Sequence, residues 1–551
     1  MPLDLSAFIQ ASFKHPKPAN VTYTYGTAGF RLRGELLDSV IFRMGVLAVL
    51  RSKKMDGRTI GIMLTASHNP EPDNGVKLVD PRGEMLDTQW EPYATELANA
   101  ADETALTRAM QKIIEEKHID VGKPAHVVFG RDTRPTGPAL IQALTECLEA
   151  LGGGTTKVTF QDYGILTTPQ LHYIVRCINT QGAYGQPTVE GYYEKLGAAY
   201  KKLVQGHRRL SPLVVDCANG VGAPKLRELA RHIGEDHLLV RLVNADTETP
   251  GQLNHQCGAD FVKTQQNFPA HIEGHPKERY AALDGDADRL VYFYMDEKDR
   301  TFKLLDGDKI SGLAAMFIKD LTRNAGLENI TVGVVQTAYA NGSSTNYLKD
   351  VLQVPVTCAQ TGVKHLHHEA EKYDIGVYFE ANGHGTVLFN HPATQALAET
   401  RARSPAQAEA LDQLKALSEL INQTVGDAFS DILLVEVILT HRQWSLSQWD
   451  HAYTDLPNRL VKVVVGDRAA FRTTNADTQL VEPAGLQEKI NELVAKYRAG
   501  RSFVRPSGTE DVVRVYAEAG NRHECDQLAF KVAGMVFDLA GGKGERPTEF
   551  L

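Results

Sequence analysis

Short apolar runs that end in charged or glycine-containing turns alternate with helix-type stretches along most of the chain, and this alternation limits the fold more than any other feature. The runs cover residues 58–64, 126–130, 213–216, 280–283, 330–337 and 375–379. Amphipathic helices are predicted between them, over residues 36–50, 138–151 and from about residue 224. Strands that alternate with helices predict an α/β fold with parallel or mixed sheets. Ligands gather at the carboxyl ends of strands in such sheets, where these turns fall.

The size and charge of the chain narrow the possible partners. With 551 residues it is too long for one core, and a typical size of about 150 residues per domain predicts three or four domains. Nucleic acid and anionic membranes need a basic face, so the net charge of −9 argues against both. No long apolar run, basic leader or CxxC spacing of the six cysteines occurs. We therefore expect a cytoplasmic protein that acts on a small molecule.

The strand at residues 58–64 runs into Thr65-Ala-Ser-His-Asn-Pro70. Asn-Pro forbids a regular continuation of the strand, which places Ser67 at an exposed strand end. Its hydroxyl is suited to act as a nucleophile or to carry a transferred group. An ordinary turn fits these six residues equally well. Asp73-Asn-Gly75 predicts a further turn, before a strand at residues 76–79.

Asp284, Asp286 and Asp288 form a second constellation, in the turn after an apolar run. Their spacing turns all three carboxylates toward one side, where they repel one another unless a cation binds. Mg²⁺ is the natural companion. An EF-hand is excluded because Arg289 and Met295 occupy the positions of its glycine and glutamate. The alternative is a solvated acidic turn.

Arginines and glycine turns suggest sites for anions. Arg505-Pro-Ser-Gly-Thr509 supplies a cation, two hydroxyls and free backbone N–H groups, and Arg514 could reach the same anion from the next strand. It is not a Walker loop. Arg31 lies in a second glycine-broken loop, at residues 25–33. A structural turn remains an alternative for both loops.

Glu380-Ala-Asn-Gly-His384 follows the last of the apolar runs. A carboxylate and an amide held by a glycine turn suit the vicinal hydroxyls of a sugar. A buried histidine satisfied by the backbone is the competing explanation for His384.

Together these four stretches resemble the α-D-phosphohexomutase superfamily, and most closely its eukaryotic phosphoacetylglucosamine mutase branch. Residues 65–70 look like the phosphoserine loop, 284–289 the metal loop, 379–385 the sugar loop and 505–510 the phosphate loop. Glu71-Pro-Asp-Asn-Gly75 stands where glucose-type mutases often carry Gly-Gly, and the sugar loop lacks their Gly-Glu-x-Ser-Gly. Both differences favour the acetylamino-sugar branch over phosphoglucomutase or phosphomannomutase.

The resemblance implies four domains around a central cleft. Three would be α/β domains with mixed sheets, and the fourth a smaller α+β domain. We place them at residues 1–180 (phosphoserine loop), 181–298 (metal), 299–438 (sugar) and 439–551 (C-terminal phosphate binding). A monomer or weak dimer is expected.

The resemblance also implies an activity and the residues that perform it. Phosphorylated Ser67 would pass its phosphoryl group to N-acetylglucosamine 6-phosphate, and a hexosamine 1,6-bisphosphate would return the other one, giving the 1-phosphate on the route to UDP-N-acetylglucosamine. One Mg²⁺ would bind Asp284, Asp286, Asp288 and Ser67. His68 and Arg31 would assist at the serine, with Lys77 a weaker candidate beside it. Substrate contacts are expected from a set that spans three loops: Arg289, Glu380, Ala381, Asn382, Arg505, Pro506, Ser507, Gly508, Thr509 and Arg514.

Two questions stay open at this point. The general base and the residues around the N-acetyl group cannot be assigned from the sequence. A metal-dependent sugar-phosphate phosphatase would share most of these residues, and release of inorganic phosphate would identify it.

Overall fold

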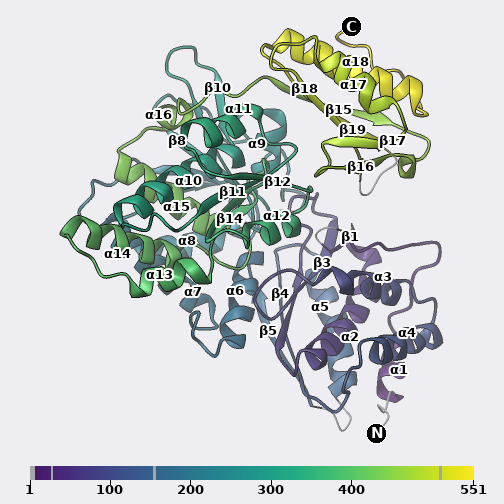
Figure 1. The fold of residues 1–551 in the computed structure, drawn as a ribbon. Coiled ribbons are helices and arrows are strands. Elements are labelled where there is room, and N and C mark those ends of the chain that lie inside the picture. Colours follow the sequence, from purple (N-terminus) through teal and green to yellow (C-terminus); the bar gives the residue numbers. More distant parts are fainter. Residues whose placement is uncertain (1–5, 27–28, 153–156, 508–511) are drawn as a thin grey trace. The chain divides into compact units, whose positions relative to one another are not determined.

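The computed structural model describes residues 6–26, 29–152, 157–507 and 512–551. The chain divides into two compact units, which are described separately here (Figure 1). The first comprises Met1–Asp306, His384–Thr386 and Lys415–Ser445. The second comprises Gly307–Gly383, Val387–Leu414 and Leu446–Leu551. No helix among the described residues is both long and apolar enough to cross a membrane.

A five-stranded mixed sheet in the order β1-β3-β2-β4-β5 opens the first unit. β2 is parallel to β4 and antiparallel to β3, and β4 is parallel to β5. The strands are β1 (Phe30–Arg33), β2 (Thr59–Leu64), β3 (Asp73–Val79), β4 (Ala125–Arg131) and β5 (Val158–Ile165). The helices are α1 (Ser6–Ser12), α2 (Asp38–Lys54), α3 (Glu91–Asn99), α4 (Glu103–Glu116), α5 (Gly137–Gly152) and α6 (Thr168–Asn179), with short 3₁₀ turns at Gly34–Leu36 and Thr88–Trp90.

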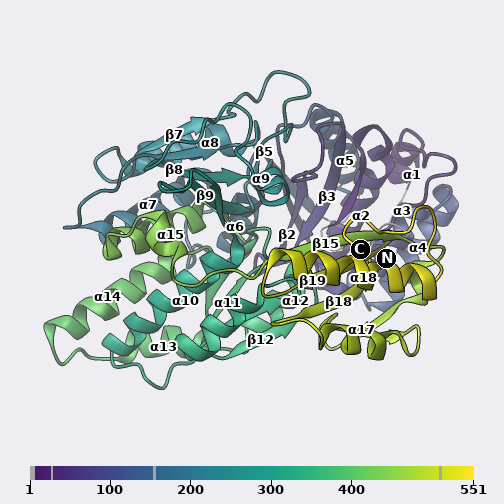
Figure 2. The same cartoon turned by 90° about the horizontal axis from the view of Figure 1, so that it is seen from above.

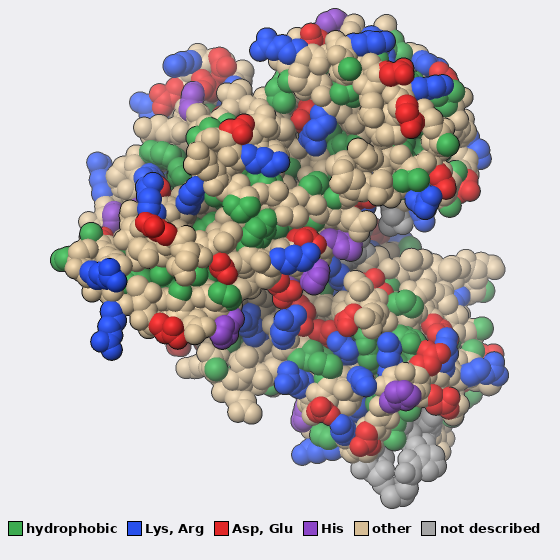
Figure 3. Space-filling model, in the orientation of Figure 1, with side chains coloured by type: hydrophobic (Ala, Val, Ile, Leu, Met, Phe, Trp, Pro, Cys, Tyr) green, Lys and Arg blue, Asp and Glu red, His purple; other side chains and the backbone are tan. Residues whose placement is uncertain are grey.

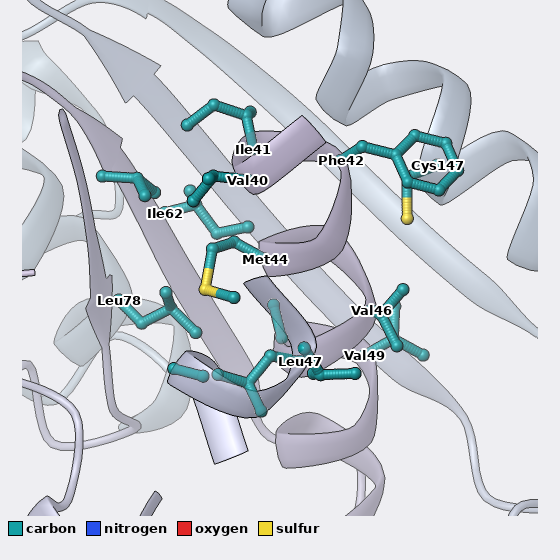
Figure 4. Close-up of a cluster of buried hydrophobic side chains, with 14 of the residues drawn as sticks. Val40, Ile41, Phe42, Met44, Val46, Leu47, Val49, Ile62, Leu78 and Cys147 are labelled. Atoms are coloured by element: carbon teal, nitrogen blue, oxygen red, sulfur yellow. The ribbon is translucent and has the colours of Figure 1, made fainter. Parts of the chain in front are cut away.

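Helix α2 forms the centre of the core beside this sheet. Val40, Met44 and Leu47 face Ile62 and Leu78 of the sheet (Figure 4), and all five side chains are buried. The opposite side of α2 packs on α5, so α2 is apolar nearly all round. The helix and strand predicted at residues 36–50 and 58–64 are thereby confirmed.

A second mixed sheet carries the aspartate-rich turn and has the order β10-β9-β8-β6-β7. β6 is parallel to β7 and β8, and β9 is antiparallel to β8. Its strands are β6 (Leu213–Asp216), β7 (Val240–Val243), β8 (Arg279–Leu283), β9 (Leu290–Met295) and β10 (Phe302–Leu305). The helices are α7 (Val189–Val204), α8 (Gly222–Ile233), α9 (Ala259–Gln265) and, from much later in the chain, α15 (Ala428–Arg442).

Helix α15 completes the first unit by neutralising a buried charge. Glu436 accepts two hydrogen bonds from Arg279, both at 2.8 Å, and one from the Tyr292 hydroxyl at 3.2 Å. At the start of the helix, Asp427 accepts the hydroxyl of Tyr192 at 2.7 Å. A buried guanidinium is costly unless it is paired, so this late segment is part of the earlier fold.

The second unit contains a sheet in the order β12-β11-β13-β14. Its strands are β11 (Val332–Thr337), β12 (Val356–Ala359), β13 (Ile375–Phe379) and β14 (Gly385–Phe389), the last of which starts at the boundary with the first unit. Around it are α10 (Gly307–Asn324), α11 (Gly342–Asn346), a π-helical turn (Tyr347–Val351), α12 (Val363–Ala370), α13 (His391–Glu399), α14 (Pro405–Leu420) and α16 (Leu446–Asp450).

The C-terminal part has an antiparallel sheet in the order β15-β19-β18, and helix α18 lies along one face of it (Figure 2). The strands are β15 (Asn458–Val464), β18 (Arg501–Pro506) and β19 (Val512–Glu518), with a separate hairpin of β16 (Arg472–Thr474) and β17 (Gln479–Glu482). The helices are α17 (Leu486–Val494) and α18 (Arg522–Leu539), with a 3₁₀ turn at Arg468–Ala470. On the molecular face drawn in Figure 3, acidic and basic side chains are interspersed.

The turn predicted at Asp73-Asn-Gly75 is wrong, because these residues begin β3. β3 is bonded to β1 on one side and β2 on the other, and two strand partners outweigh the local preference of Asn-Gly. The turn lies just before it, where the Asp73 N–H donates to Pro70 O at 3.0 Å.

Candidate active site

Ser67 lies beyond the end of β2 in a backbone conformation that its side chain does not favour. Its φ is +49°, in the left-handed region, and its N–H donates to Thr65 Oγ1 at 2.9 Å. The expectation of an exposed serine is wrong: Ser67 is only 1% exposed. Charged groups cover it, because Arg31 Nη2 and Asp286 Oδ2 lie 3.0 Å from its hydroxyl and Lys77 Nζ lies 3.2 Å away.

The turn between β8 and β9 brings three buried carboxylates together. Asp284, Asp286 and Asp288 each offer an oxygen, and these oxygens lie within 4.8 Å of one another. Asp284 Oδ2 and Asp286 Oδ1 are buried without a hydrogen-bond partner among the described residues. Oxygen atoms left unpaired in this way are hard ligands, and they fit a Mg²⁺ ion.

Charges around the turn shift the acidity of its members in opposite directions. Burial raises the pKa of Asp284 well above its usual value, and Asp288 and Asp286 add to the effect. Burial alone would also raise the pKa of Asp288, but Lys77 and His384 outweigh it and hold that pKa well below the usual range. The turn therefore contains carboxyl groups of unlike proton affinity.

Lys77 links the serine to the aspartates. It projects from β3 and lies 3.1 Å from Asp286 Oδ2 and 3.2 Å from Asp288 Oδ2, as well as near Ser67. Burial would lower the pKa of Lys77, but the two carboxylates outweigh it and raise that pKa. Sequence reasoning ranked Lys77 low, because nothing in Val76–Val79 distinguishes it from a lysine on a solvated strand.

Arg31, His68 and Arg289 also lie in this part of the first unit. Burial and the neighbouring Arg289 lower the pKa of Arg31. The pKa of His68 falls to about 2 through burial and the nearby charges of Arg289 and Arg31, so its ring is neutral. Arg289 Nη1 lies 3.4 Å from Asp260 Oδ1. The three sequence candidates thus share one cationic environment.

Two contacts around the turn escaped sequence reasoning. Thr168, at the start of α6, donates its hydroxyl to Asp286 Oδ2 at 2.6 Å and its N–H to Asp286 O at 3.2 Å. His384 Nδ1 lies 3.5 Å from Asp288 Oδ1. Thr167-Thr-Pro-Gln170 signals a helix start, but no local pattern connects it to a turn more than a hundred residues later.

The rest of the sugar-type loop belongs to the second unit. Glu380, Ala381 and Asn382 follow β13, and Asn382 Nδ2 donates to Glu380 Oε2 at 3.3 Å. Gly307 approaches the backbone so closely that a Cβ there would lie 1.9 Å from Glu380 O. Only glycine fits at that position, and its contact fixes the course of the loop.

The anion-type loop of the second unit places two arginines opposite each other. Arg505 on β18 and Arg514 on β19 are direct cross-strand partners. Like charges at such positions repel and favour an anion between them. Arg505 Nε lies 3.1 Å from Asp477 Oδ2, and the Ser507 N–H donates to Val512 O at 2.9 Å.

Two further candidates of this loop, Gly508 and Thr509, lie outside the described residues, and Pro506 ends β18.

Comparison with known proteins gives a family for each part of the chain. Residues 180–291 match the model for phosphoacetylglucosamine mutase AMG1, domain II, and residues 306–444 match domain III. Residues 47–105 and 94–184 match the phosphoglucomutase/phosphomannomutase alpha/beta/alpha domain I, and residues 460–535 the C-terminal domain. Phosphoacetylglucosamine mutase of Sus scrofa is 52% identical over 553 residues, covering 99% of both chains.

The chain belongs to the phosphoacetylglucosamine mutase family.

Other members of the phosphoacetylglucosamine mutase family support this assignment. The Saccharomyces cerevisiae enzyme is 46% identical, with 94% of this chain and 96% of that one covered. Aspergillus fumigatus N-acetylphosphoglucosamine mutase in complex with GlcNAc-6P and magnesium is 51% identical, with a TM-score of 0.93 and coverage of 98% and 99%. The prediction of a four-domain α/β phosphohexomutase fold is confirmed, and the chain is an enzyme of this superfamily.

Proposed function

We propose that this chain interconverts N-acetylglucosamine 6-phosphate and N-acetylglucosamine 1-phosphate, with Ser67 as the carrier of the phosphoryl group. The observation that carries the proposal is the position of the Ser67 hydroxyl, 3.0 Å from Asp286 in a turn that holds unpaired carboxylate oxygens. A serine in an ordinary turn would not have two cations and a carboxylate at its hydroxyl.

Asp284, Asp286 and Asp288, with an oxygen on Ser67, are the residues that would hold Mg²⁺. When bound there, the ion neutralises charge on the group in transfer. Thr168 and Lys77 occupy Asp286 Oδ2, at 2.6 and 3.1 Å, and leave Oδ1 of the same carboxylate available. The surrounding residues thus select which oxygen faces the ion.

Transfer moves one phosphoryl group in each half-reaction. The bond between Ser67 Oγ and phosphorus breaks while a sugar hydroxyl oxygen bonds to phosphorus and loses its proton. Arg31 and Lys77, at 3.0 and 3.2 Å from Oγ, stabilise the negative charge that returns to the serine. The resulting 1,6-bisphosphate then reorients and gives its other phosphoryl group back to Ser67. His68 and Arg289 would line this end of the site.

The second unit would hold the non-reacting part of the substrate. Glu380 and Asn382 present a carboxylate and an amide for ring hydroxyls, beside the backbone of Ala381. Arg505, Ser507 and Arg514 would bind the distant phosphate, with Pro506 shaping the turn. Gly508 and Thr509 would contribute from outside the described residues. A sugar phosphate that binds in two orientations needs an anchor of this kind, because its ring contacts change between half-reactions.

The remaining expectations belong to the same proposal. They are domains at 1–180, 181–298, 299–438 and 439–551, a cytoplasmic location, a monomer or weak dimer, and no nucleic-acid or membrane partner.

The test combines mass spectrometry with a substrate panel. Peptide mass spectrometry of the purified protein should find a phosphate on Ser67. Phosphates of glucose, mannose and N-acetylglucosamine should give the highest kcat/KM with the last. Release of inorganic phosphate without isomerisation would favour a phosphatase, and a preference for glucose phosphates would favour a phosphoglucomutase.

A further inference from the structure

Arg134 is fully buried and directs its guanidinium at a single loop. It lies in the turn after β4, and its exposed fraction is 0%. Nη2 donates to Ser67 O at 3.0 Å and Asn69 O at 2.9 Å, and Nη1 donates to Pro70 O and Asp73 O, both at 2.7 Å. Four carbonyl oxygens of the serine loop therefore share one side chain.

The remaining N–H of the guanidinium leads to the other side of the serine. Nε of Arg134 donates to Asp132 Oδ2 at 3.0 Å, and this carboxylate also accepts the Thr65 hydroxyl at 2.7 Å. Thr65 in turn accepts the Ser67 N–H at 2.9 Å. Both peptide groups of Ser67 are thus fixed by one connected network of side chains.

Asn254 reaches the same carbonyls from the part of the chain that carries the aspartates. Its Nδ2 donates to Ser67 O at 2.8 Å and to Asn69 O at 3.0 Å. The metal-type turn also touches this carbonyl, since a Cβ on Gly285 would lie 2.5 Å from Ser67 O. The serine loop and the aspartate turn are therefore held against each other through the Ser67 carbonyl.

This network explains how Ser67 keeps a disfavoured backbone. A left-handed φ on a residue other than glycine costs energy and persists only where surrounding groups fix it. The same backbone sets the direction of the side chain, and hence the 3.0 Å distance from Oγ to Asp286 Oδ2.

We propose that Arg134 and Asn254 are positioning residues that hold the Ser67 hydroxyl at the metal-type turn for phosphoryl transfer. The proposal rests on the function proposed above. Arg134 does not bind substrate phosphate, because all five of its N–H groups are engaged by the protein. Lysine has three donors on a flexible stem and cannot reproduce the pattern.

Three variants test this. Arg134→Lys keeps the charge but removes donors. Asn254→Gly removes the amide and tolerates the backbone φ of +58°. Arg43→Lys is the matched control, because Arg43 is also buried and its Nη1 donates to a carbonyl, Ala98 O at 2.8 Å, away from the serine loop. We expect kcat to fall by about 10²-fold in the first two variants. KM should stay near the wild-type value, and the control should match wild type.

Hydrogen exchange supplies a readout that does not depend on activity. Amides of residues 65–73 should exchange faster in Arg134→Lys and Asn254→Gly than in wild type and in Arg43→Lys. Should Arg134→Lys fail to fold, Asn254→Gly carries the test. A wild-type kcat with unchanged exchange in Asn254→Gly overturns the proposal, and so does a raised KM at constant kcat. A wild-type protein that lacks mutase activity instead refutes the proposed function, while the exchange comparison still tests the loop.

Discussion

Individual side chains in this protein take part in more than one interaction at the proposed transfer site. Lys77 lies within 3.2 Å of Ser67, Asp286 and Asp288. Groups shared in this way are pre-positioned, because moving one of them breaks several contacts at once. Substitutions here should therefore affect the chemical step more than the fold.

Ser67→Ala should abolish turnover while leaving the fold and sugar-phosphate binding largely intact, because it removes only the oxygen that carries the phosphoryl group. Ser311→Ala is the control, as Ser311 is equally buried and its hydroxyl has no hydrogen-bond partner among the described residues. Turnover can be followed by ³¹P NMR and binding by calorimetry. Near-wild-type turnover of the Ser67 variant would eliminate the carrier scheme.

Arg505→Ala should weaken substrate binding by about 1.5–3 kcal/mol through loss of a charged hydrogen bond. Asp477→Asn should have a smaller effect, because an amide oxygen can still accept the Arg505 N–H now seen at 3.1 Å. Arg472→Ala serves as control, since Arg472 pairs with Glu482 at 3.0 Å on the exposed hairpin. Calorimetric titration with N-acetylglucosamine 6-phosphate measures all three, and unchanged affinity of the Arg505 variant would contradict its role as anchor.

At the scale of secondary structure, elements distant in the sequence meet at their ends. The start of α6 bonds the aspartate turn through Thr168, and the segment before α15 bonds it through the Ala428 N–H, 3.2 Å from Ala287 O. The turn is thus supported by elements from both sides of it in the sequence, which is how a short loop with three carboxylates keeps one conformation.

Thr168→Val should weaken Mg²⁺ binding by about 10- to 100-fold, because a support of a metal ligand is lost at constant side-chain volume. Thr322→Val in α10 is a matched control, as Thr322 is buried and its hydroxyl bonds only the helix carbonyl of Lys319 at 2.9 Å. The apparent Mg²⁺ affinity follows from titrating activity in chelated enzyme. Equal affinity in both variants would show that Thr168 gives no support.

Asp216, at the end of β6, should make stability depend on pH. Burial raises its pKa to about 6, although hydrogen bonds from Gly258, Ala218 and Asn244 partly oppose the shift. The unfolded chain ionises first as pH rises from about 4 to 6, so the free energy of unfolding should fall across this window.

The matching experiment compares urea unfolding of wild type and Asp216→Asn at pH 4 and pH 7. The difference between the two proteins should move against wild type by about 2–3 kcal/mol as pH rises. Any constant cost of the amide cancels in this comparison. A difference that does not change with pH would mean that Asp216 is ionised throughout.

Sequence reasoning succeeded where the signal is local. The strands that end near Leu64, Asp216 and Leu283 follow from apolar runs, and the three-aspartate turn from its spacing. The roles of Lys77 and Arg134 stayed hidden, because their partners lie up to 211 residues away. The turn at Asp73–Gly75 was misjudged for a related reason: pairing with two strands overrode a local preference.

For the molecule as a whole, the two units do not correspond to two halves of the chain. The first unit is interrupted after Asp306 and resumes with Lys415–Ser445, which contains α15. Since Glu436 of α15 neutralises the buried Arg279, the earlier segment is incomplete without the later one.

A fragment of residues 1–306 should therefore lack a cooperative unfolding transition. An unpaired buried arginine costs about 3–5 kcal/mol, a large part of the stability of a domain. Joining residues 415–445 to the fragment through a flexible linker should restore the transition, as measured by circular dichroism. Cooperative unfolding of the unlinked fragment would show that α15 is dispensable.

The late position of α15 also has a consequence for how the polypeptide is made. A ribosome adds Arg442 more than a hundred residues after Asp306. At about 5–20 residues per second this leaves the nascent first unit unfinished for roughly 7–27 s. During that interval Arg279 and the apolar surface destined for α15 are accessible to chaperones, so the demand for such help should peak while the second unit is being translated.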